Sequence, residues 1–168
     1  MENLKTIRTT LTLFIKDGKI LLGEKKRGFA KGTFNGIGGK QDPGETIEQA
    51  MIRECQEEVG ATPTKFNQVG RINFNLWYKG KHSNMEMYIY KCQEYSGTIQ
   101  ETEEIIPHWF DLNNPPFERM LEDDLLWLPQ VLSGKNIIGK VNFDPNMKML
   151  YHNIKDVEKI DETEILAL

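Results

Sequence analysis

The stretch from Glu45 to Val59 constrains the fold and the chemistry of this chain more than any other part of its sequence. Its residue types favour a helix, and Gly60 stands where helices often end in the left-handed conformation. The preceding triplet, Asp-Pro-Gly at 42–44, is typical of a turn. We therefore expect a helix of about four turns that starts directly after this turn.

Three carboxylates lie on an unusual side of this helix. At about 100° per residue, Glu54, Glu57 and Glu58 fall on or beside the apolar side. That apolar side consists of Ile47, Ala50, Met51 and Cys55. Acids spaced i, i+3 and i+4 beside a buried face repel one another and lose hydration, and bound cations such as Mg²⁺ or Mn²⁺ remove that cost. The helix alone is also compatible with a Glu-rich helix that serves solubility.

Apolar and β-branched runs separated by turn residues predict a sheet around this helix. The runs expected to form strands are 9–15, 19–23, 69–78, 86–92, 105–112, 137–143 and 147–154. Helical spacing predicts a second helix over 117–132, and the residues after Lys155 suit either a short helix or a frayed end. Because no repeat or linker interrupts the chain, we expect residues 1–168 to form one α/β domain with a mixed sheet.

Composition narrows the classes of partner. Acidic residues outnumber basic ones by 25 to 21, a net charge of −4, which argues against a long nucleic-acid track. Cys55 and Cys92 form no CxxC motif, so we expect two reduced, buried thiols. No apolar run approaches the ~20 residues that span a bilayer, and the N-terminus lacks a signal-peptide pattern. A cytoplasmic protein, monomeric or homodimeric, without a membrane partner is the expectation.

The surroundings of the helix carry a longer motif. Gly39 is followed after five residues by Glu45 and after seven more by the run Arg53-Glu54-Cys55-Gln56-Glu57-Glu58-Val59-Gly60-Ala61. This spacing resembles the Nudix hydrolase signature at every defined position, with the small residues Cys55 and Ala61 in its two apolar slots. The resemblance implies an α/β/α sandwich with a mixed central sheet, and an enzyme that cleaves a diphosphate linkage in a nucleotide.

The same resemblance assigns roles. It implies that Glu54, Glu57 and Glu58 hold Mg²⁺, with Mn²⁺ as an alternative, helped by the carbonyl of Gly38 and by a loop acid. By its position relative to Trp109-Phe110, Glu104 best matches that loop acid. Arg53 and Glu45 are expected to pair and to orient the metal ligands. Either Glu58 or Glu104 is expected to act as general base.

Segments outside the motif resemble one branch of the family. The runs 22–29, 34–40 and 116–127 are similar to the MutT-like branch that removes oxidised purine nucleoside triphosphates, such as 8-oxo-dGTP or 2-oxo-dATP, and the likeness spans roughly residues 8 to 152. It implies release of monophosphate and pyrophosphate, a nucleotide-pool sanitising reaction. Two positions depart from this branch, because Leu121 and Phe34 stand where a tryptophan is common.

The branch implies a purine pocket. Asn35 offers a donor and an acceptor to a base edge, and one of the adjacent Asp123 and Asp124 can donate a hydrogen bond if burial keeps it protonated. Apolar walls are expected from Phe29, Phe74, Leu76, Met85 and Trp127, and Lys25 is expected to reach the phosphates or the sugar. The full expected substrate-binding set is Thr10, Lys25, Phe29, Asn35, Phe74, Met85, Leu121, Asp123, Asp124 and Trp127.

Two other functions stay open from the sequence. A Nudix enzyme of another specificity would cleave general nucleoside triphosphates, dinucleotide polyphosphates, ADP-ribose, nucleotide sugars or capped RNA. A non-catalytic nucleotide sensor on the same fold is the weaker alternative, because every carboxylate of the motif is present.

Overall fold

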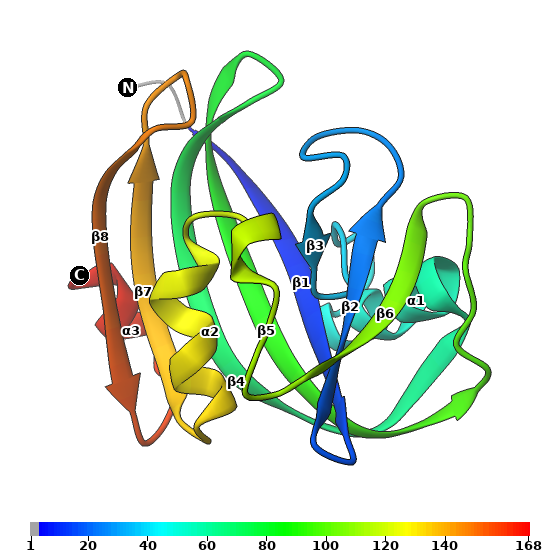
Figure 1. Cartoon of the computed structure of the whole chain (residues 1–168). Helices are drawn as coiled ribbons and strands as arrows, with labels where there is room; N and C mark the ends of the chain where they lie inside the picture. Colours follow the sequence, from blue (N-terminus) through cyan, green and yellow to red (C-terminus); the bar gives the residue numbers. More distant parts are fainter. Residues whose placement is uncertain (1–3) are drawn as a thin grey trace.

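Two long antiparallel strands, β4 and β5, form the centre of a mixed eight-stranded sheet (Figure 1). The computed structural model describes residues 4–168. Its strands are β1 (Lys5–Lys16), β2 (Lys19–Lys25), β3 (Phe34–Asn35), β4 (Ala61–Tyr78), β5 (Lys81–Gly97), β6 (Ile105–Asp111), β7 (Asn136–Phe143) and β8 (Met149–Val157). Its helices are α1 (Ile47–Val59), α2 (Asp124–Leu132), α3 (Glu162–Leu166) and the 3₁₀ helix η1 (Phe117–Arg119).

The order of strands explains how the sheet is mixed. Along the sheet the order is β3-β2-β1-β5-β4-β7-β8, and β6 pairs with β2. β1 pairs parallel with β5 and β4 pairs parallel with β7, whereas the hairpins β1–β2, β4–β5 and β7–β8 are antiparallel. The two parallel joins require crossover segments, and those segments carry the helices α1 and α2.

Each face of the sheet buries its own apolar cluster. On one face α1 packs with Met51 and Cys55 against Phe14 and Tyr90. On the opposite face α2 packs with Trp127 in a second cluster, and Figure 1 shows α2 crossing in front of the sheet. The layers are therefore helix, mixed sheet and helix, and the expected fold class is confirmed.

All seven expected strands are present, the two-residue strand β3 was not expected, and the central pair is longer than expected. Asn73-Phe74-Asn75-Leu76 alternates polar and apolar residues, and in β4 Phe74 and Leu76 are buried while the two asparagines are half-buried. β4 begins eight residues earlier than the predicted 69, directly after Gly60, because its first part pairs with β5 through several register shifts. Cys55 and Cys92 are both buried and unbridged, as expected.

The prediction of one helix over 117–132 is wrong. Met120 is extended, with φ −113° and ψ 169°, and separates η1 from α2. The side-chain Oδ2 of Asp124 accepts the backbone N–H of Leu121 at 3.1 Å, and this local bond competes with helix formation. The chain therefore enters α2 with Asp123 and Asp124 already at its first turn.

The C-terminal residues pack on the sheet as a short helix. Asp161 caps α3 by accepting the N–H of Thr163 at 2.8 Å, and Ile165 is buried. Buried Arg71 on β4 pairs with Glu86 at 3.2 Å and with Glu162 of α3. In the described part of the chain, no helix is both long and apolar enough to cross a bilayer.

Replacing Ile165 by alanine should measure the docking of α3. Ile165 is 1% exposed, so its loss should lower the free energy of unfolding by about 2 kcal/mol or more. The neighbouring Leu166→Ala is the matched control, because Leu166 is 79% exposed and its loss should change stability by less than about 0.5 kcal/mol. Urea unfolding checks both, and equal effects of the two variants would contradict a docked α3.

Candidate active site

The helix α1 begins after Glu45, so this motif residue lies outside the helix. Thr46 is the N-cap: its side chain accepts the N–H of Gln49 at 3.1 Å, and the Gln49 side chain accepts the N–H of Thr46 at 2.9 Å. The helix therefore begins at Ile47, two residues later than expected. Glu45 stands in the loop before the cap, where its carboxylate is free to turn toward Arg53.

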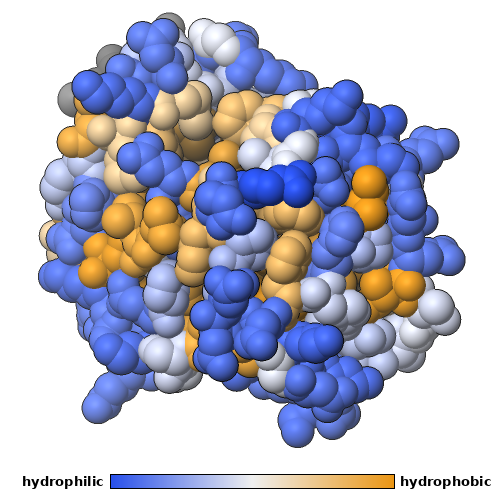
Figure 2. Space-filling view, in the orientation of Figure 1, coloured by the Kyte–Doolittle hydropathy of each residue, from blue (hydrophilic) through white to orange (hydrophobic). Residues whose placement is uncertain are grey.

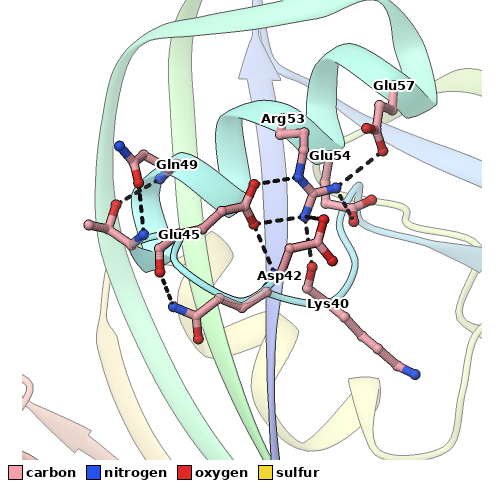
Figure 3. A network of polar contacts seen from close by, with 9 residues as sticks. Lys40, Asp42, Glu45, Gln49, Arg53, Glu54 and Glu57 are labelled. Carbon is pink, nitrogen blue, oxygen red and sulfur yellow. Dashed lines mark hydrogen bonds and ion pairs between the residues drawn. The ribbon is translucent and has the colours of Figure 1, made fainter.

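Arg53 is the centre of a polar network at this loop (Figure 3). Its guanidinium donates to both carboxylate oxygens of Glu45, at 2.6 and 3.0 Å, and to the carbonyl of Lys40 at 2.9 Å. It also donates to Glu54 at 2.9 Å and to Glu57 at 3.2 Å. The bond from Arg53 lowers the pKa of Glu45, and the bonds to Glu45 and Glu54 raise the pKa of Arg53. The expected pair of Arg53 and Glu45 thus ties the loop to the helix.

The two glycines of the motif permit close contact with the helix carboxylates. The N–H of Gly38 donates to Glu58 Oε2 at 3.1 Å. A Cβ at Gly39 would lie 2.5 Å from the carboxylate carbon of Glu54, and one at Gly38 would lie 1.8 Å from the carbonyl oxygen of Thr10. Larger residues at 38 and 39 would therefore push the loop away from α1 and from β1.

Glu58 and Glu54 lie in a site where negative charge is costly. Burial, together with the neighbouring carboxylates of Glu54 and Glu104, raises the pKa of Glu58 to about 8. Burial also raises the pKa of Glu54, against the lowering effect of Arg53. Both residues keep to the half-buried side of α1, as expected, whereas the side chain of Glu57 is 60% exposed.

The loop 101–104 is held beside this site by basic residues. Lys26 donates to Glu101 at 2.8 Å and to the carbonyl of Thr102 at 2.9 Å, while Arg27 pairs with Glu104 at 3.0 Å. The hydroxyl of Thr102 donates to the carbonyl of Glu58 at 2.8 Å. These anchoring contacts were not anticipated, although the sequence shows the basic run 25–27 that makes them.

The four expected metal-binding carboxylates are not gathered around one point. Among residues 4–168, no three Asp, Glu, His or Cys side chains converge closely enough to hold a metal ion. Arg53 engages Glu54 and Glu57, and Arg27 engages Glu104. The assignment of these carboxylates as metal ligands therefore stays a prediction. The donor chemistry still fits Mg²⁺ or Mn²⁺, because half-buried Glu58 and Glu54 offer only oxygens and a cation relieves the repulsion from their neighbouring carboxylates.

A second set of acids lies at the start of α2. Asp123 and Asp124 are 8% and 3% exposed. Burial raises the pKa of Asp123 to about 6, and burial together with the charge of Asp123 raises the pKa of Asp124 well above its ordinary value. Leu121, half-buried, lies three residues before Asp124 and is fixed to it by two hydrogen bonds at 3.1 Å. This pair is the buried acid pair that the sequence led us to expect.

An apolar cluster lies on the face of the sheet that α2 covers. Phe74 and Trp127 are buried and Met85 is partly buried in one cluster, and Phe74 stacks on Phe143 with ring centroids 6.3 Å apart. Figure 2 shows apolar side chains gathered across this face and bordered by hydrophilic ones. Phe143, at the end of β7, was not anticipated, because nothing in its neighbouring sequence marks it out.

Two expected pocket residues lie elsewhere. Thr10 pairs with Tyr88, which packs in the α1 cluster, so the side chain of Thr10 lies on the face opposite Phe74 and Trp127. This contradicts a side-chain contact with the same pocket and follows from the register of β1. Phe29 is 62% exposed in the loop after β2 and is not part of either apolar cluster.

Asn35 and Lys25 lie at the edge strands. Asn35 ends β3, is half-buried, and accepts the N–H of Gly36 with its own Oδ1 at 2.9 Å. Lys25 ends β2, and its positive charge lowers the pKa of Glu58. Lys25 is thus within electrostatic reach of the carboxylates of α1, where the phosphates of a nucleotide would meet a metal.

Replacing Asp123 by asparagine should change how stability depends on pH. The folded-state pKa of about 6 exceeds the value of about 3.9 in an unfolded chain, so the stability linked to this group is full below about pH 4 and is lost as pH rises through about 6. Relative to the variant, the wild type should lose up to about 3 kcal/mol of unfolding free energy between pH 4 and pH 7.5.

Chemical unfolding at several pH values measures this difference. The exposed Glu118, on η1, supplies the control Glu118→Gln, whose difference from the wild type should stay flat with pH. A flat difference for Asp123→Asn as well would contradict the assigned burial of a protonated acid.

The chain is similar to known proteins along most of its length. The family model described as NUDIX domain matches residues 5–131. An oxidized purine nucleoside triphosphate hydrolase of Danio rerio is 40% identical over 151 residues, which cover 90% of this chain and 96% of that protein. The enzyme of the same description from Mus musculus is 37% identical over 149 residues, covering 89% and 94%.

Solved structures agree on the fold. The crystal structure of a MutT protein from Bacillus halodurans superposes with a TM-score of 0.77 at 24% identity, covering 88% of this chain and 97% of that one. The motif at α1, the layered sheet and the match over residues 5–131 lead to one conclusion: the chain belongs to the Nudix hydrolase family.

Proposed function

We propose that this Nudix hydrolase cleaves purine nucleoside triphosphates with an oxidised base to a monophosphate and pyrophosphate. The observation that carries the proposal is the buried pair Asp123 and Asp124, since the α1 motif alone serves many nucleotide substrates. The two relatives at 40% and 37% identity, both described as oxidized purine nucleoside triphosphate hydrolases, support the same substrate class.

The raised pKa values of the acid pair suit an altered purine. At neutral pH a protonated Asp124 donates a hydrogen bond, and its neighbour Asp123 accepts one when ionised. A pair with one donor and one acceptor matches a ring N–H next to a carbonyl, the edge that oxidation or tautomerisation changes in a purine. Trp127 and Phe74 supply the apolar surface that surrounds such a base.

The phosphates are assigned to the α1 side of the site. Glu54, Glu57 and Glu58, with the carbonyl of Gly38, would hold Mg²⁺ or Mn²⁺, and Arg53 would keep Glu54 and Glu57 oriented through the bonds it already makes. A bound divalent ion would offset the charge that develops on the phosphates and lower the pKa of water. Lys25, close enough to influence Glu58, would bind a phosphate oxygen.

Two carboxylates are candidates for accepting the proton of the attacking water. Glu58 is held by the N–H of Gly38, and Glu104 is exposed on the neighbouring loop, where Arg27 holds it. A carboxylate that gains a proton during the reaction must be ionised beforehand. Glu58, whose pKa burial raises to about 8, is largely protonated near neutral pH in the nucleotide-free protein, which favours the loop carboxylate as the base.

Leu121 favours a broader specificity as the alternative. It is half-buried three residues before Asp124, at the position where the branch usually carries a tryptophan. An aliphatic side chain loses roughly 1–3 kcal/mol of stacking on the base relative to an aromatic one. Selection among purines would then rest on the hydrogen bonds of Asp123 and Asp124 more than on stacking.

A panel of nucleotides tests the proposal directly. With Mg²⁺, the wild type should convert 8-oxo-dGTP or 2-oxo-dATP to monophosphate and pyrophosphate with a higher kcat/KM than dGTP or dATP. Release of orthophosphate, or equal kcat/KM for oxidised and normal purines, would contradict it. ADP-ribose in the same panel tests the alternative of nucleoside diphosphate cleavage.

Glutamine at position 57 or 58 should abolish turnover while keeping the fold. Each substitution removes one carboxylate charge from the proposed metal site and should lower kcat/KM by at least about 10²-fold. Glu48→Gln is the matched control, because Glu48 is an exposed acid in the first turn of the same helix. Activity that survives in both Glu57→Gln and Glu58→Gln would show that the metal site is wrongly assigned.

A further inference from the structure

Arg119 connects two segments that lie far apart in the sequence. From η1 its guanidinium donates to Glu24 Oε1 at 2.9 Å and to the carbonyl of Gly32 at 2.9 Å. The carbon atom Cζ of Arg119 also lies 4.5 Å from the centroid of the Phe34 ring. One side chain thus contacts the end of β2, the loop after it and the first residue of β3.

Phe34 is enclosed by its neighbours on this face. It is 3% exposed and meets Phe110 edge-on at 4.9 Å and His108 edge-on at 5.3 Å between ring centroids. His108 in turn lies 3.5 Å from Glu24 Oε2. Arg119 therefore adds a cation–π contact to the aromatic residues that enclose Phe34. Because Asn35 follows Phe34 directly in the chain, the position of Phe34 determines where the backbone of Asn35 lies.

The two connected segments carry the two halves of the proposed base site. Asn35, which the sequence assigns to the base edge, follows the loop that Arg119 contacts. Leu121 and the pair Asp123 and Asp124 follow Arg119 within five residues, after the helix is broken at Met120. Because the η1–α2 segment is not a continuous helix, helix geometry does not fix the acids relative to β3. The contacts of Arg119 bridge this break.

An exposed arginine adds little to stability, yet this one is held at several points. Its side chain is 48% exposed, and pairs of this kind contribute little to the free energy of unfolding. A planar guanidinium held by two oxygens and one aromatic ring, however, has a single orientation, which a lysine cannot reproduce. Its contribution should therefore appear in alignment of the site more than in stability.

On the basis of the purine triphosphate function proposed above, we propose that Arg119 is a positioning residue for base recognition. It aligns Asn35 on β3 with Asp123 and Asp124 on α2 through its contacts with Glu24, Gly32 and Phe34. The contacts of Arg119 include neither Lys25 nor the carboxylates of α1, so its role concerns the affinity for the base and leaves the hydrolytic step unchanged.

Steady-state kinetics of Arg119→Met test this role with 8-oxo-dGTP, dGTP and dCTP as substrates. The KM for 8-oxo-dGTP should rise at least about fivefold, because misaligned base contacts weaken binding. The kcat should stay within about twofold, the pattern of lost ground-state binding, and the preference over dCTP should fall. Arg119→Lys, which keeps the charge near Glu24, should restore only part of the KM. Glu118→Gln, on the same 3₁₀ helix, should leave both parameters unchanged.

Amide hydrogen exchange supplies a second readout that does not need turnover. Arg119→Met should speed exchange in residues 28–36 and leave exchange in α1 unchanged. An unchanged KM for 8-oxo-dGTP, a fall in kcat alone, or unchanged exchange in 28–36 would each overturn the positioning role. If the wild type itself does not prefer purine triphosphates, both the proposed function and the role of Arg119 in base selectivity are contradicted. Amide hydrogen exchange then still shows whether Arg119 holds residues 28–36 in place.

Discussion

The guanidinium of Arg53 holds together two segments that the sheet does not itself connect: the loop 38–45 and the helix α1. Glu45 accepts two of its hydrogen bonds and the carbonyl of Lys40 accepts a third, so the loop cannot leave the helix without breaking all three. With the loop in place, Gly38 reaches Glu58 and Gly39 lies against Glu54. The positions of the carboxylates thus depend on the guanidinium of Arg53 and on the absence of a side chain at Gly38 and Gly39.

This arrangement costs free energy at the carboxylates, which lose hydration and repel one another. Glu54 and Glu58 are turned toward the protein, and burial and mutual repulsion raise their pKa values. Asp123 and Asp124 repeat the pattern on the other face of the sheet. Such pairs do not stabilise the fold, because burial removes water from carboxylates that are ionised in the unfolded chain. Acids with strongly shifted pKa values cluster at functional sites, and this is why we propose metal-assisted chemistry at the first pair and base recognition at the second.

The α1 site was largely predictable from the sequence because its information is local. Gly39, Glu45, Arg53 and the three glutamates lie within one loop and one helix. In a helix, the spacing of residues along the sequence determines the direction in which each side chain points. The parts that could not be predicted depend on long-range register or on a single local bond. The side of the sheet to which Thr10 points is set by the pairing of β1 with β5, and the break before α2 is set by the bond between Asp124 and Leu121. The contact of Arg119 with Glu24 joins residues 95 positions apart.

The central claim is that the carboxylates around Gly38 and Gly39 form a divalent-cation site that Arg53 keeps in register. Calorimetric titration of Mn²⁺ into the nucleotide-free protein measures it most directly, with Glu54→Gln as the variant and Glu103→Gln, an exposed acid of the neighbouring loop, as its match. Saturable binding to the wild type and to Glu103→Gln, with affinity at least about tenfold weaker in Glu54→Gln, is the expected result. Equal binding to all three proteins would contradict the claim.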